Sequence, residues 1–349
     1  MKYVPLGASG LGTSIYALGT ATFGDSTDED ETIQVLDTFV DAGGLLIDTA
    51  DAYTDGRAEQ LIGRWLRTKS PQVREQVLLS TKGGGYTTTA GLNQWGNTRH
   101  NLTRVLEISL RSLGVDCLTL YQAHTWDPLT PLEETLRFLD DALRAGKIRY
   151  AGISNYTGWQ LQKTVDLTET LGLTTPITFQ AQYSLLCREV EWEIIPAGLH
   201  NGLGLLAWSP LSGGLLSGKY TRHETPTETA RFADPTARGK MHDAYVNALY
   251  SAHVTRERTW LVLKLLGEIA VARNVTPAAV ALAWVAARPG VSGVVLGVRT
   301  AEQLAANLEA RSITLSDDET ERLNEASDPG GSGYPYGSFG AMQRSRAIE

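Results

Sequence analysis

The sequence contains few cysteines and no long apolar run, and both deficits limit the class of protein. Only two cysteines, Cys117 and Cys187, occur in 349 residues, each in or beside an apolar segment. We expect two buried thiols in a reducing compartment, because unpaired cysteines usually behave as small apolar residues. No run of about 18 apolar residues is present, and residues 1–5 contain no apolar targeting core. A cytoplasmic, soluble protein is therefore expected.

Positive charge is also scarce. The chain has 31 lysines and arginines against 39 aspartates and glutamates, a formal net charge of −8. Nucleic acids and anionic membranes bind basic surfaces, so we expect neither as a partner. Any phosphate group must instead be bound locally, by one or two cations.

Short apolar strands alternate with amphipathic helices about eight times, which is typical of βαβ units. A glycine-rich turn over 7–10 joins 2–6 to 15–18 and predicts an N-terminal β-hairpin. The further predicted strands are 45–48, 77–80, 118–121, 148–153, 177–179, 203–208 and 291–296. The predicted helices are 29–42, 58–68, 99–113, 132–145, 159–171, 189–200, 256–273, 277–288 and 301–308.

This repeat favours a closed (β/α)₈ TIM barrel, with the hairpin at one end. An open doubly wound sheet would need a glycine fingerprint between its first strand and a helix. Gly10 and Gly12 lie in the predicted hairpin and precede no helix. We expect one domain over residues 1–325 and a C-terminal tail over 326–349. Two long loops, 83–98 and 220–251, interrupt the repeat and are candidate covers for a site.

The predicted strands end in side chains that can do chemistry. In (β/α)₈ enzymes the active site lies at the carboxyl ends of the strands. Because these ends all meet at one face of the barrel, we expect their side chains to share one pocket. The residues at or just after the strand ends are Asp48, Lys82, His124, Ser154, Asn155, Gln180, Trp208, Gly297 and Arg299.

Asp48, Tyr53, Lys82 and His124 form a possible proton-transfer set. Lys82 can pair with Asp48, and an ammonium beside the Tyr53 phenol should lower the tyrosine pKa from about 10. Tyr53 then suits the role of general acid near neutral pH, while His124 can hold a carbonyl oxygen or assist the proton transfer. Each residue alone has an ordinary structural explanation. Their joint occurrence at successive strand ends is what favours catalysis.

Several motifs in this order resemble those of the aldo-keto reductase superfamily, in the bacterial branch related to potassium-channel β-subunits. The resemblance extends over about residues 1–325, the length of one TIM barrel. The motifs are DTADAY at 48–53, STK at 80–82, YQAH at 121–124, RAGKIRYAGISN at 144–155, QAQYSLL at 180–186 and WSPLSGGLLSGKY at 208–220.

The resemblance implies NADPH-dependent reduction of an aldehyde or ketone, with Tyr53 as general acid assisted by Lys82, Asp48 and His124. Arg299 is a planar cation suited to a 2′-phosphate, which favours NADPH over NADH. The implied cofactor contacts are Gly19, Thr20, Asp48, Ser154, Asn155, Gln180, Trp208, Ser209, Pro210, Leu211, Gly213, Gly297, Arg299, Gln303 and Asn307. The implied substrate contacts are Phe23, Tyr53, Tyr86, Trp95, His124 and Trp126.

Three other hypotheses remain open at this stage. One is a cofactor-binding regulatory protein of the same fold, with slow or vestigial reductase activity. Another is a lyase that forms a Schiff base on Lys82, which is disfavoured because it needs a lysine of lowered pKa and a nearby Asp48 would raise that pKa. A third is a metal hydrolase, which is disfavoured because His124 has no second histidine at ligand spacing. We expect no metal, and a small-molecule carbonyl compound as the substrate.

Overall fold

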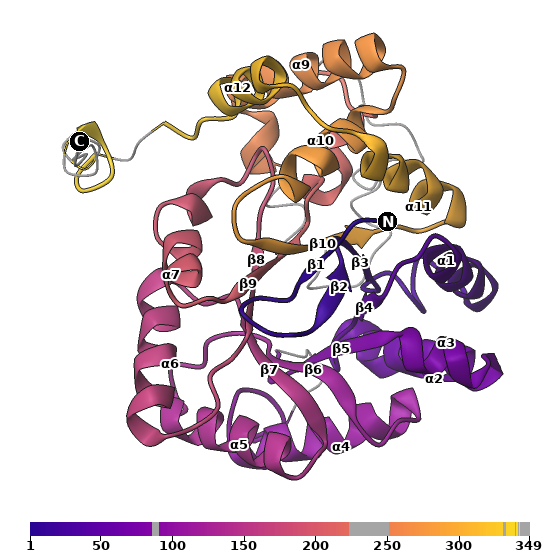
Figure 1. Ribbon diagram of the computed structural model, residues 1–349, viewed down its shortest axis with the longest axis vertical. Helices are drawn as coiled ribbons and strands as arrows, with labels where there is room; N and C mark the ends of the chain where they lie inside the picture. Colours follow the sequence, from indigo (N-terminus) through magenta and orange to yellow (C-terminus); the bar gives the residue numbers. More distant parts are fainter. Residues whose placement is uncertain (86–90, 223–250, 331–332, 339, 341, 343–349) are drawn as a thin grey trace.

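The computed structural model describes the chain except for residues 86–90, 223–250, 331–332, 339, 341 and 343–349. Eight parallel strands close into a barrel in the order β10-β3-β4-β5-β6-β7-β8-β9, and helices surround it (Figure 1). The predicted (β/α)₈ architecture is confirmed. The strands are β1 (Tyr3–Pro5), β2 (Gly12–Ser14), β3 (Tyr16–Gly19), β4 (Leu46–Asp48), β5 (Leu78–Gly83), β6 (Leu118–Ala123), β7 (Ile148–Ser154), β8 (Thr178–Gln182), β9 (Gly204–Trp208) and β10 (Val291–Gly297).

Most helices lie close to their predicted positions. The α-helices are α1 (Glu29–Asp41), α2 (Arg57–Thr68), α3 (Pro71–Gln76), α4 (Arg99–Leu113), α5 (Leu132–Arg144), α6 (Gly158–Leu171), α7 (Ile194–His200), α9 (Glu257–Arg273), α10 (Pro277–Ala286), α11 (Ala301–Leu308) and α12 (Asp317–Ala326). Short 3₁₀ turns are η1 (Tyr53–Gly56), η2 (Glu189–Glu191), η3 (Ser212–Ser217) and η4 (Glu309–Ser312).

The N-terminal hairpin differs from its prediction in one strand. β1 pairs with β2, whereas the segment at 15–18, predicted as its second strand, forms most of β3 and is the first barrel strand. Residues 16–19 pair with β10 and are buried throughout, which a two-stranded hairpin cannot provide. Leu6, the residue after β1, enters the barrel and packs with Ala17 and Leu46. The hairpin therefore closes the end of the barrel opposite the strand tips, as Figure 1 shows.

Two helical predictions need correction. The segment at 189–200 is not one helix but η2 followed by α7. Pro196 explains the break, because its ring would clash with the carbonyl of Trp192 in a continuous helix. Helix α12 was not predicted, although Ser316 and Glu319 form a capping box at its start. Leu323 is its one buried residue, so its apolar periodicity is weak.

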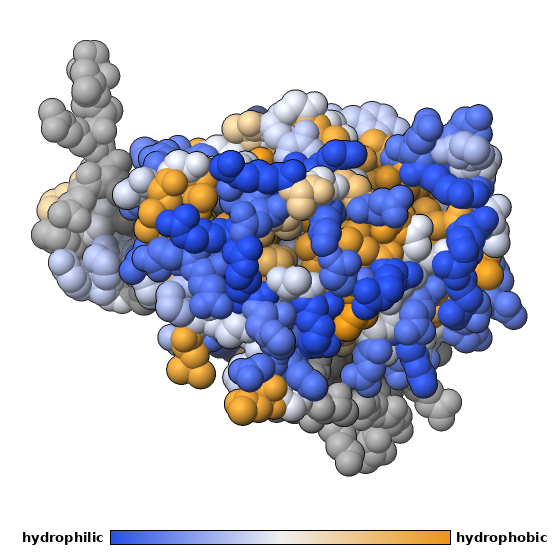
Figure 2. All heavy atoms as spheres, turned by 90° about the horizontal axis from the view of Figure 1, so that it is seen from below, coloured by the Kyte–Doolittle hydropathy of each residue, from blue (hydrophilic) through white to orange (hydrophobic). Residues whose placement is uncertain are grey.

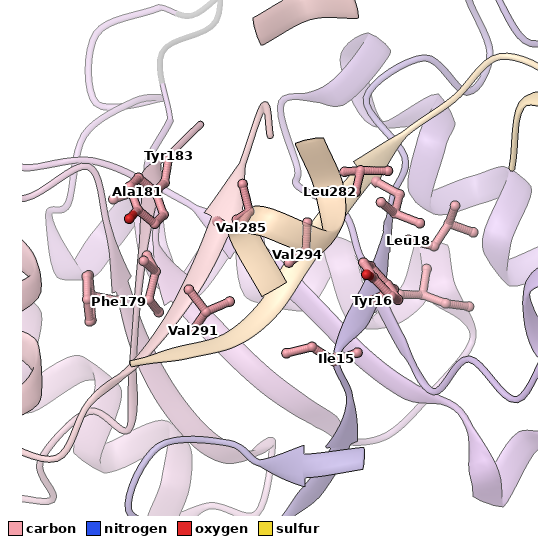
Figure 3. Close-up of a cluster of buried hydrophobic side chains, with 14 of the residues drawn as sticks. Ile15, Tyr16, Leu18, Phe179, Ala181, Tyr183, Leu282, Val285, Val291 and Val294 are labelled. Atoms are coloured by element: carbon pink, nitrogen blue, oxygen red, sulfur yellow. The ribbon is translucent and has the colours of Figure 1, made fainter. Parts of the chain in front are cut away.

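The main hydrophobic core fills the layer between the barrel and its helices. Figure 3 shows Leu282 and Val285 of α10 facing the strand residues Tyr16, Leu18 and Val294. All of these side chains are nearly inaccessible to solvent. Helix α10 is apolar on every side because its whole length is buried between the barrel and neighbouring helices.

The outward faces of the helices are polar. In α5, Leu132, Leu136 and Leu139 are buried, while Glu133 and Arg137 are exposed. The face seen in Figure 2 is accordingly dominated by hydrophilic residues with apolar ones scattered between them. Among the described residues no single helix is long and apolar enough to cross a membrane; α9 and α10 pass that test only together, as a pair bent by 100°.

One residue of the predicted tail, Tyr336, contacts the barrel domain. Tyr336 stacks on Trp192 with ring centroids 5.4 Å apart and donates a hydrogen bond to Glu193. The division into a barrel over 1–325 and a tail over 326–349 stays a prediction. The predicted insertion at 220–251 lies almost wholly outside the described residues.

Candidate active site

Lys82 and Asp48 form an ion pair buried in the barrel. The Lys82 Nζ lies 2.7 Å from Asp48 Oδ2, and each side chain is 1% exposed. The same Nζ donates to the carbonyl of Thr49 at 2.7 Å and to the Tyr53 hydroxyl at 3.2 Å. An ammonium has three N–H groups, so each has an acceptor. Lys82 is thereby fixed in one position beside the phenol.

The local backbone explains how these groups meet. Strand β4 pairs with β5 in a register that places Asp48 opposite Ser80. Side chains alternate along a strand, so Ser80 and Lys82 share the inward face. Tyr53 follows β4 in the turn η1, where Thr54 has a left-handed φ of 49°. The Thr54 hydroxyl donates to the carbonyl of Phe23 at 2.8 Å and holds this turn in place.

The predicted lowering of the Tyr53 pKa is wrong in its net direction. Burial raises the pKa of Tyr53, and the Lys82 ammonium opposes that rise. Lys82 therefore does lower the Tyr53 pKa, as predicted, but desolvation of the phenolate raises that pKa by more. Tyr53 is protonated over the whole neutral range, as a general acid must be before it reacts.

Lys82 is charged. Burial lowers the pKa of Lys82, but Asp48 and Tyr53 raise it more, so the net pKa lies above the ordinary value. Schiff-base formation requires a neutral amine. The lyase hypothesis therefore has no support in this site.

His124 completes the group beside Tyr53. Its ring centroid lies 6.0 Å from that of Tyr53, with the two planes at 80°. Burial and the neighbouring Lys82 lower the pKa of His124 to about 3. A neutral imidazole has one N–H, so His124 can donate one hydrogen bond to a ligand oxygen.

Asp51 and Glu59 form an acidic pair beside these residues. Asp51 Oδ1 and Glu59 Oε2 are buried without a hydrogen-bond partner among the described residues. Burial and the nearby Glu59 raise the pKa of Asp51 to about 7. Asp51 thus retains its proton in the folded protein at pH values where it is ionised in the unfolded chain.

We expect Asp51→Asn to remove a pH dependence of stability. Asp51 ionises near pH 4 when unfolded and near pH 7 when folded, so the wild type loses stability as the pH rises through this window. The loss from this group between pH 5 and pH 8 should be about 2–3 kcal/mol. Asp51→Asn should be the more stable protein at pH 8, as measured by urea unfolding. Asp55→Asn, an exposed change in the same turn, should keep the wild-type slope, and equal slopes for all three proteins would contradict the expectation.

A pocket of about 600 Å³ opens beside Tyr53 and His124 at the strand ends. Its size lies within the range of small-molecule sites, which is about 300–1,000 Å³. The structure brings nearly all predicted cofactor contacts to its wall: Gly19, Thr20, Ser154, Asn155, Gln180, Trp208, Ser209, Pro210, Leu211, Gly213, Gly297, Arg299, Gln303 and Asn307.

Asp48 is the exception among the predicted cofactor contacts. It is 1% exposed and does not line the pocket. Its two carboxylate oxygens are occupied by side-chain donors, including Lys82 and Gln180. The direct contact of Asp48 with a cofactor stays a prediction; in this structure Asp48 is separated from the pocket by Gln180, which does line it.

Hydrogen bonds fix the pocket wall near Tyr53. The Trp208 Nε1 donates to Asn155 Oδ1 at 3.1 Å, and Asn155 Nδ2 donates to the His124 carbonyl at 3.0 Å. The Ser154 hydroxyl donates to the backbone carbonyl of Gln180 at 3.2 Å. Asn155 thus sets the orientation of the indole and ties it to the strand end that carries His124.

The far end of the pocket is held by the loop after β3. Thr22 donates to the carbonyl of Val298 at 2.7 Å, and Thr27 donates to that of Arg299 at 3.2 Å. The Arg299 N–H donates to Gln303 Oε1 at 3.0 Å. These bonds hold the start of α11, and with it Arg299, at the pocket wall.

The predicted substrate contacts divide into four groups. Tyr53 and His124 line the pocket. Phe23 is fully buried in the hydrophobic core, so its prediction is wrong: the loop after β3 turns this side chain inward. Trp126 packs against Tyr156 and Trp159.

Trp95 is 45% exposed. Neither it nor Trp126 is among the residues that line the pocket, and both stay predictions. Tyr86 lies outside the described residues.

Sequence reasoning missed two buried neighbours of Asp48, Ser80 and Gln122. Strand alternation could have found them, because each lies two residues before a predicted catalytic residue and so shares its face of the strand. It also missed Lys219, a second cation on the pocket wall. In the described parts of the chain, no cluster of three or more His, Cys, Asp or Glu side chains could bind a metal.

The barrel, the buried ion pair beside a tyrosine and the pocket at the strand ends define a (β/α)₈ protein with a candidate site of small-molecule size. A model of the aldo/keto reductase family matches residues 17–328, and the chain belongs to this family. The resemblance drawn from the motifs is thereby confirmed.

Several curated proteins are similar over nearly the whole chain. An uncharacterized oxidoreductase, YrpG of Bacillus subtilis, is 36% identical over 341 residues, covering 95% of this chain and 98% of the relative. A probable voltage-gated potassium channel subunit beta of Arabidopsis thaliana is 32% identical, covering 89% and 91%. An NADP(+) aryl-alcohol dehydrogenase of Phanerodontia chrysosporium is 27% identical, covering 97% and 85%. The family and these relatives make the chain a member of an oxidoreductase family.

Proposed function

We propose that this protein is an NADPH-dependent reductase that converts an aldehyde or ketone to an alcohol. The observation that carries the proposal is the Tyr53 hydroxyl, which lies 3.2 Å from the buried Lys82 ammonium and lines the pocket. A protonated phenol beside a fixed cation is suited to donate a proton to a carbonyl oxygen.

The pocket wall fits a nicotinamide dinucleotide in its chemistry. It combines an aromatic ring, amide side chains, serine hydroxyls and two cations, which suit a flat ring, a carboxamide and phosphates. A Cβ on Gly214 or Gly297 would meet no protein atom within 4 Å, so the backbone there borders open space. Bound NADPH would supply the hydride that the carbonyl carbon accepts.

Individual residues can be matched to parts of this cofactor. Trp208, oriented by Asn155, would lie against the nicotinamide ring. Gln180 directs its Nε2 to Asp48 at 3.1 Å, because a carboxylate can only accept, and this leaves its carbonyl oxygen for the carboxamide. Arg299 would take a 2′-phosphate, for which its planar guanidinium is suited.

The chain's own residues handle the proton. Tyr53 donates its hydroxyl proton to the carbonyl oxygen as negative charge develops there. Lys82 stabilises the phenolate that remains, and Asp48 keeps Lys82 charged and in place. The neutral His124 donates its single N–H to the same oxygen and thereby orients the substrate.

Turnover is the direct test of this function. We expect the purified protein to oxidise NADPH in the presence of an activated aldehyde such as 4-nitrobenzaldehyde, with the alcohol as product. NADPH binding without any turnover would instead favour a regulatory protein. That second candidate is favoured by the likeness to a protein named as a potassium channel β-subunit.

Arg299→Ala should weaken NADPH binding about tenfold to a hundredfold, because a charge-assisted hydrogen bond contributes about 1.5–3 kcal/mol. NADH binding should change by less than about twofold, since NADH has no 2′-phosphate. Titration of tryptophan fluorescence with each cofactor measures both constants. Arg137→Ala, at an exposed position of α5, is the control and should alter neither. Equal losses for NADPH and NADH would remove the phosphate role of Arg299.

A further inference from the structure

Asp48 receives more hydrogen bonds than its pairing with Lys82 requires. Its Oδ2 accepts from Lys82, while its Oδ1 accepts from Ser80 Oγ at 3.0 Å, Gln180 Nε2 at 3.1 Å and Gln122 Nε2 at 3.4 Å. The three Oδ1 donors come from β5, β8 and β6. The carboxylate thus has one oxygen turned towards the ammonium and the other enclosed by neutral donors.

Ser80 and Gln122 differ from Gln180 in their access to the pocket. Both are 0% exposed, and neither lines the pocket, whereas Gln180 does. Gln122 Nε2 also lies 3.1 Å from Ser80 Oγ, so the two side chains contact each other as well as Asp48. A serine hydroxyl that accepts one hydrogen bond donates a stronger one. Neither residue can therefore touch a ligand in the pocket, whereas both contact Asp48.

Asp48 has two opposing effects on Tyr53. It holds Lys82 beside the phenol, but its own negative charge raises the pKa of Tyr53. Donors on Oδ1 draw negative charge away from the side of the carboxylate that faces Lys82. They consequently leave more of the ammonium's field acting on the phenol.

We propose that Gln122 and Ser80 are positioning residues of the proton-donating site, which bind Asp48 Oδ1 so that Lys82 can stabilise the Tyr53 phenolate. This inference rests on the proposed reductase function. Among the described residues, the charged or titratable groups around Tyr53 are Lys82 of β5, Asp48 of β4, Asp51 in the following turn and the neutral His124 after β6. Without the hydrogen bonds from Gln122 and Ser80, the negative charge of Asp48 cancels more of the effect of the Lys82 ammonium on the phenol. Tyr53 then becomes a weaker acid.

Two substitutions and a matched control test the proposal. Gln122→Met and Ser80→Ala should each lower kcat for aldehyde reduction about threefold to thirtyfold, a part of the total general-acid contribution of about 10²–10⁴. The NADPH Kd should stay unchanged, because neither residue lines the pocket. Thr178→Val removes another fully buried barrel hydroxyl, one without a hydrogen-bond partner among the described residues, and should leave kcat at the wild-type value. Equal losses in all three variants would show a packing effect and overturn the proposal.

Gln122→Glu gives the sharpest readout because it nearly preserves the side-chain shape. While protonated, the introduced carboxyl group can donate to Asp48 as the Gln122 amide does. Once ionised, it cannot donate and adds a second negative charge. Two adjoining carboxylates do not both ionise readily, so this proton should be lost well above the usual pH range of a glutamate. We expect near wild-type kcat at acid pH and a decline of about tenfold as the pair loses its proton.

The outcomes separate this inference from the function on which it rests. A wild type without reductase turnover would overturn both. An active wild type whose pH profile coincides with that of Gln122→Glu would overturn only the role of Gln122 and Ser80. Recovery of kcat at acid pH in Gln122→Glu, but not in Gln122→Met, would support it.

Discussion

Replacing Tyr53 by phenylalanine should reduce kcat/KM for carbonyl reduction by about 10²–10⁴-fold, the usual contribution of a positioned general acid. The substitution removes the hydroxyl that lies 3.2 Å from Lys82 and keeps the ring that packs edge-on to His124. Cofactor binding should persist, because the rest of the pocket wall is unchanged. The measurement is NADPH oxidation at several aldehyde concentrations, with the NADPH Kd determined in parallel.

A second buried tyrosine provides the control. Tyr121 of β6 is 0% exposed, and its hydroxyl is without a hydrogen-bond partner among the described residues. Tyr121→Phe removes the same group from a tyrosine that does not line the pocket, and it should leave kcat/KM within about twofold of the wild type. A Tyr53→Phe enzyme as fast as Tyr121→Phe would contradict the assignment of Tyr53 as the acid.

Replacing Lys82 by methionine should destabilise the fold by about 3–5 kcal/mol in addition to removing activity. The substitution leaves Asp48 charged at 1% exposure with neutral donors alone. An uncompensated charge in the protein interior is costly, since water can no longer solvate it. Urea unfolding at neutral pH measures this loss of stability.

The double variant Asp48→Asn/Lys82→Met separates stability from catalysis. It removes both charges and should recover most of the stability lost in Lys82→Met, because a neutral buried pair needs no compensating ion. Activity should stay at the level of the single variant, since nothing then stabilises the Tyr53 phenolate. Arg64→Met, which breaks an exposed pair with Glu29, serves as the control and should barely change stability. A double variant less stable than Lys82→Met would contradict the buried-charge explanation.

The strand ends were the part of the site most predictable from the sequence. Asp48, Lys82, His124 and Gln180 each lie at or shortly after the end of a predicted strand, and parallel strands of a barrel all end at the same face. The sequence therefore sufficed to predict that these side chains meet, without any knowledge of distances. The predicted substrate contact of Phe23 was wrong because Phe23 lies in a loop. The direction of a loop side chain is set only when the loop packs against the rest of the protein.

The Tyr53 pKa and the pairing of the first barrel strand could not be predicted in this way, because both depend on distant parts of the chain. A lysine beside a tyrosine predicts a lowered tyrosine pKa, yet burial raises the pKa of Tyr53. Desolvation depends on how completely distant segments exclude water, which no local pattern records. Likewise, residues 15–18 looked like a hairpin strand, and only pairing with β10 makes them part of the barrel.

The sequence by itself determined the barrel, the family and the identity of the four residues that we propose act on the proton. These follow from periodicity and from the order of motifs along the chain. The tertiary structure alone decided which donors surround Asp48, because Ser80, Gln122 and Gln180 are brought together by strand register across three strands. Register and burial are properties of the closed barrel, and they set the charge balance around Tyr53.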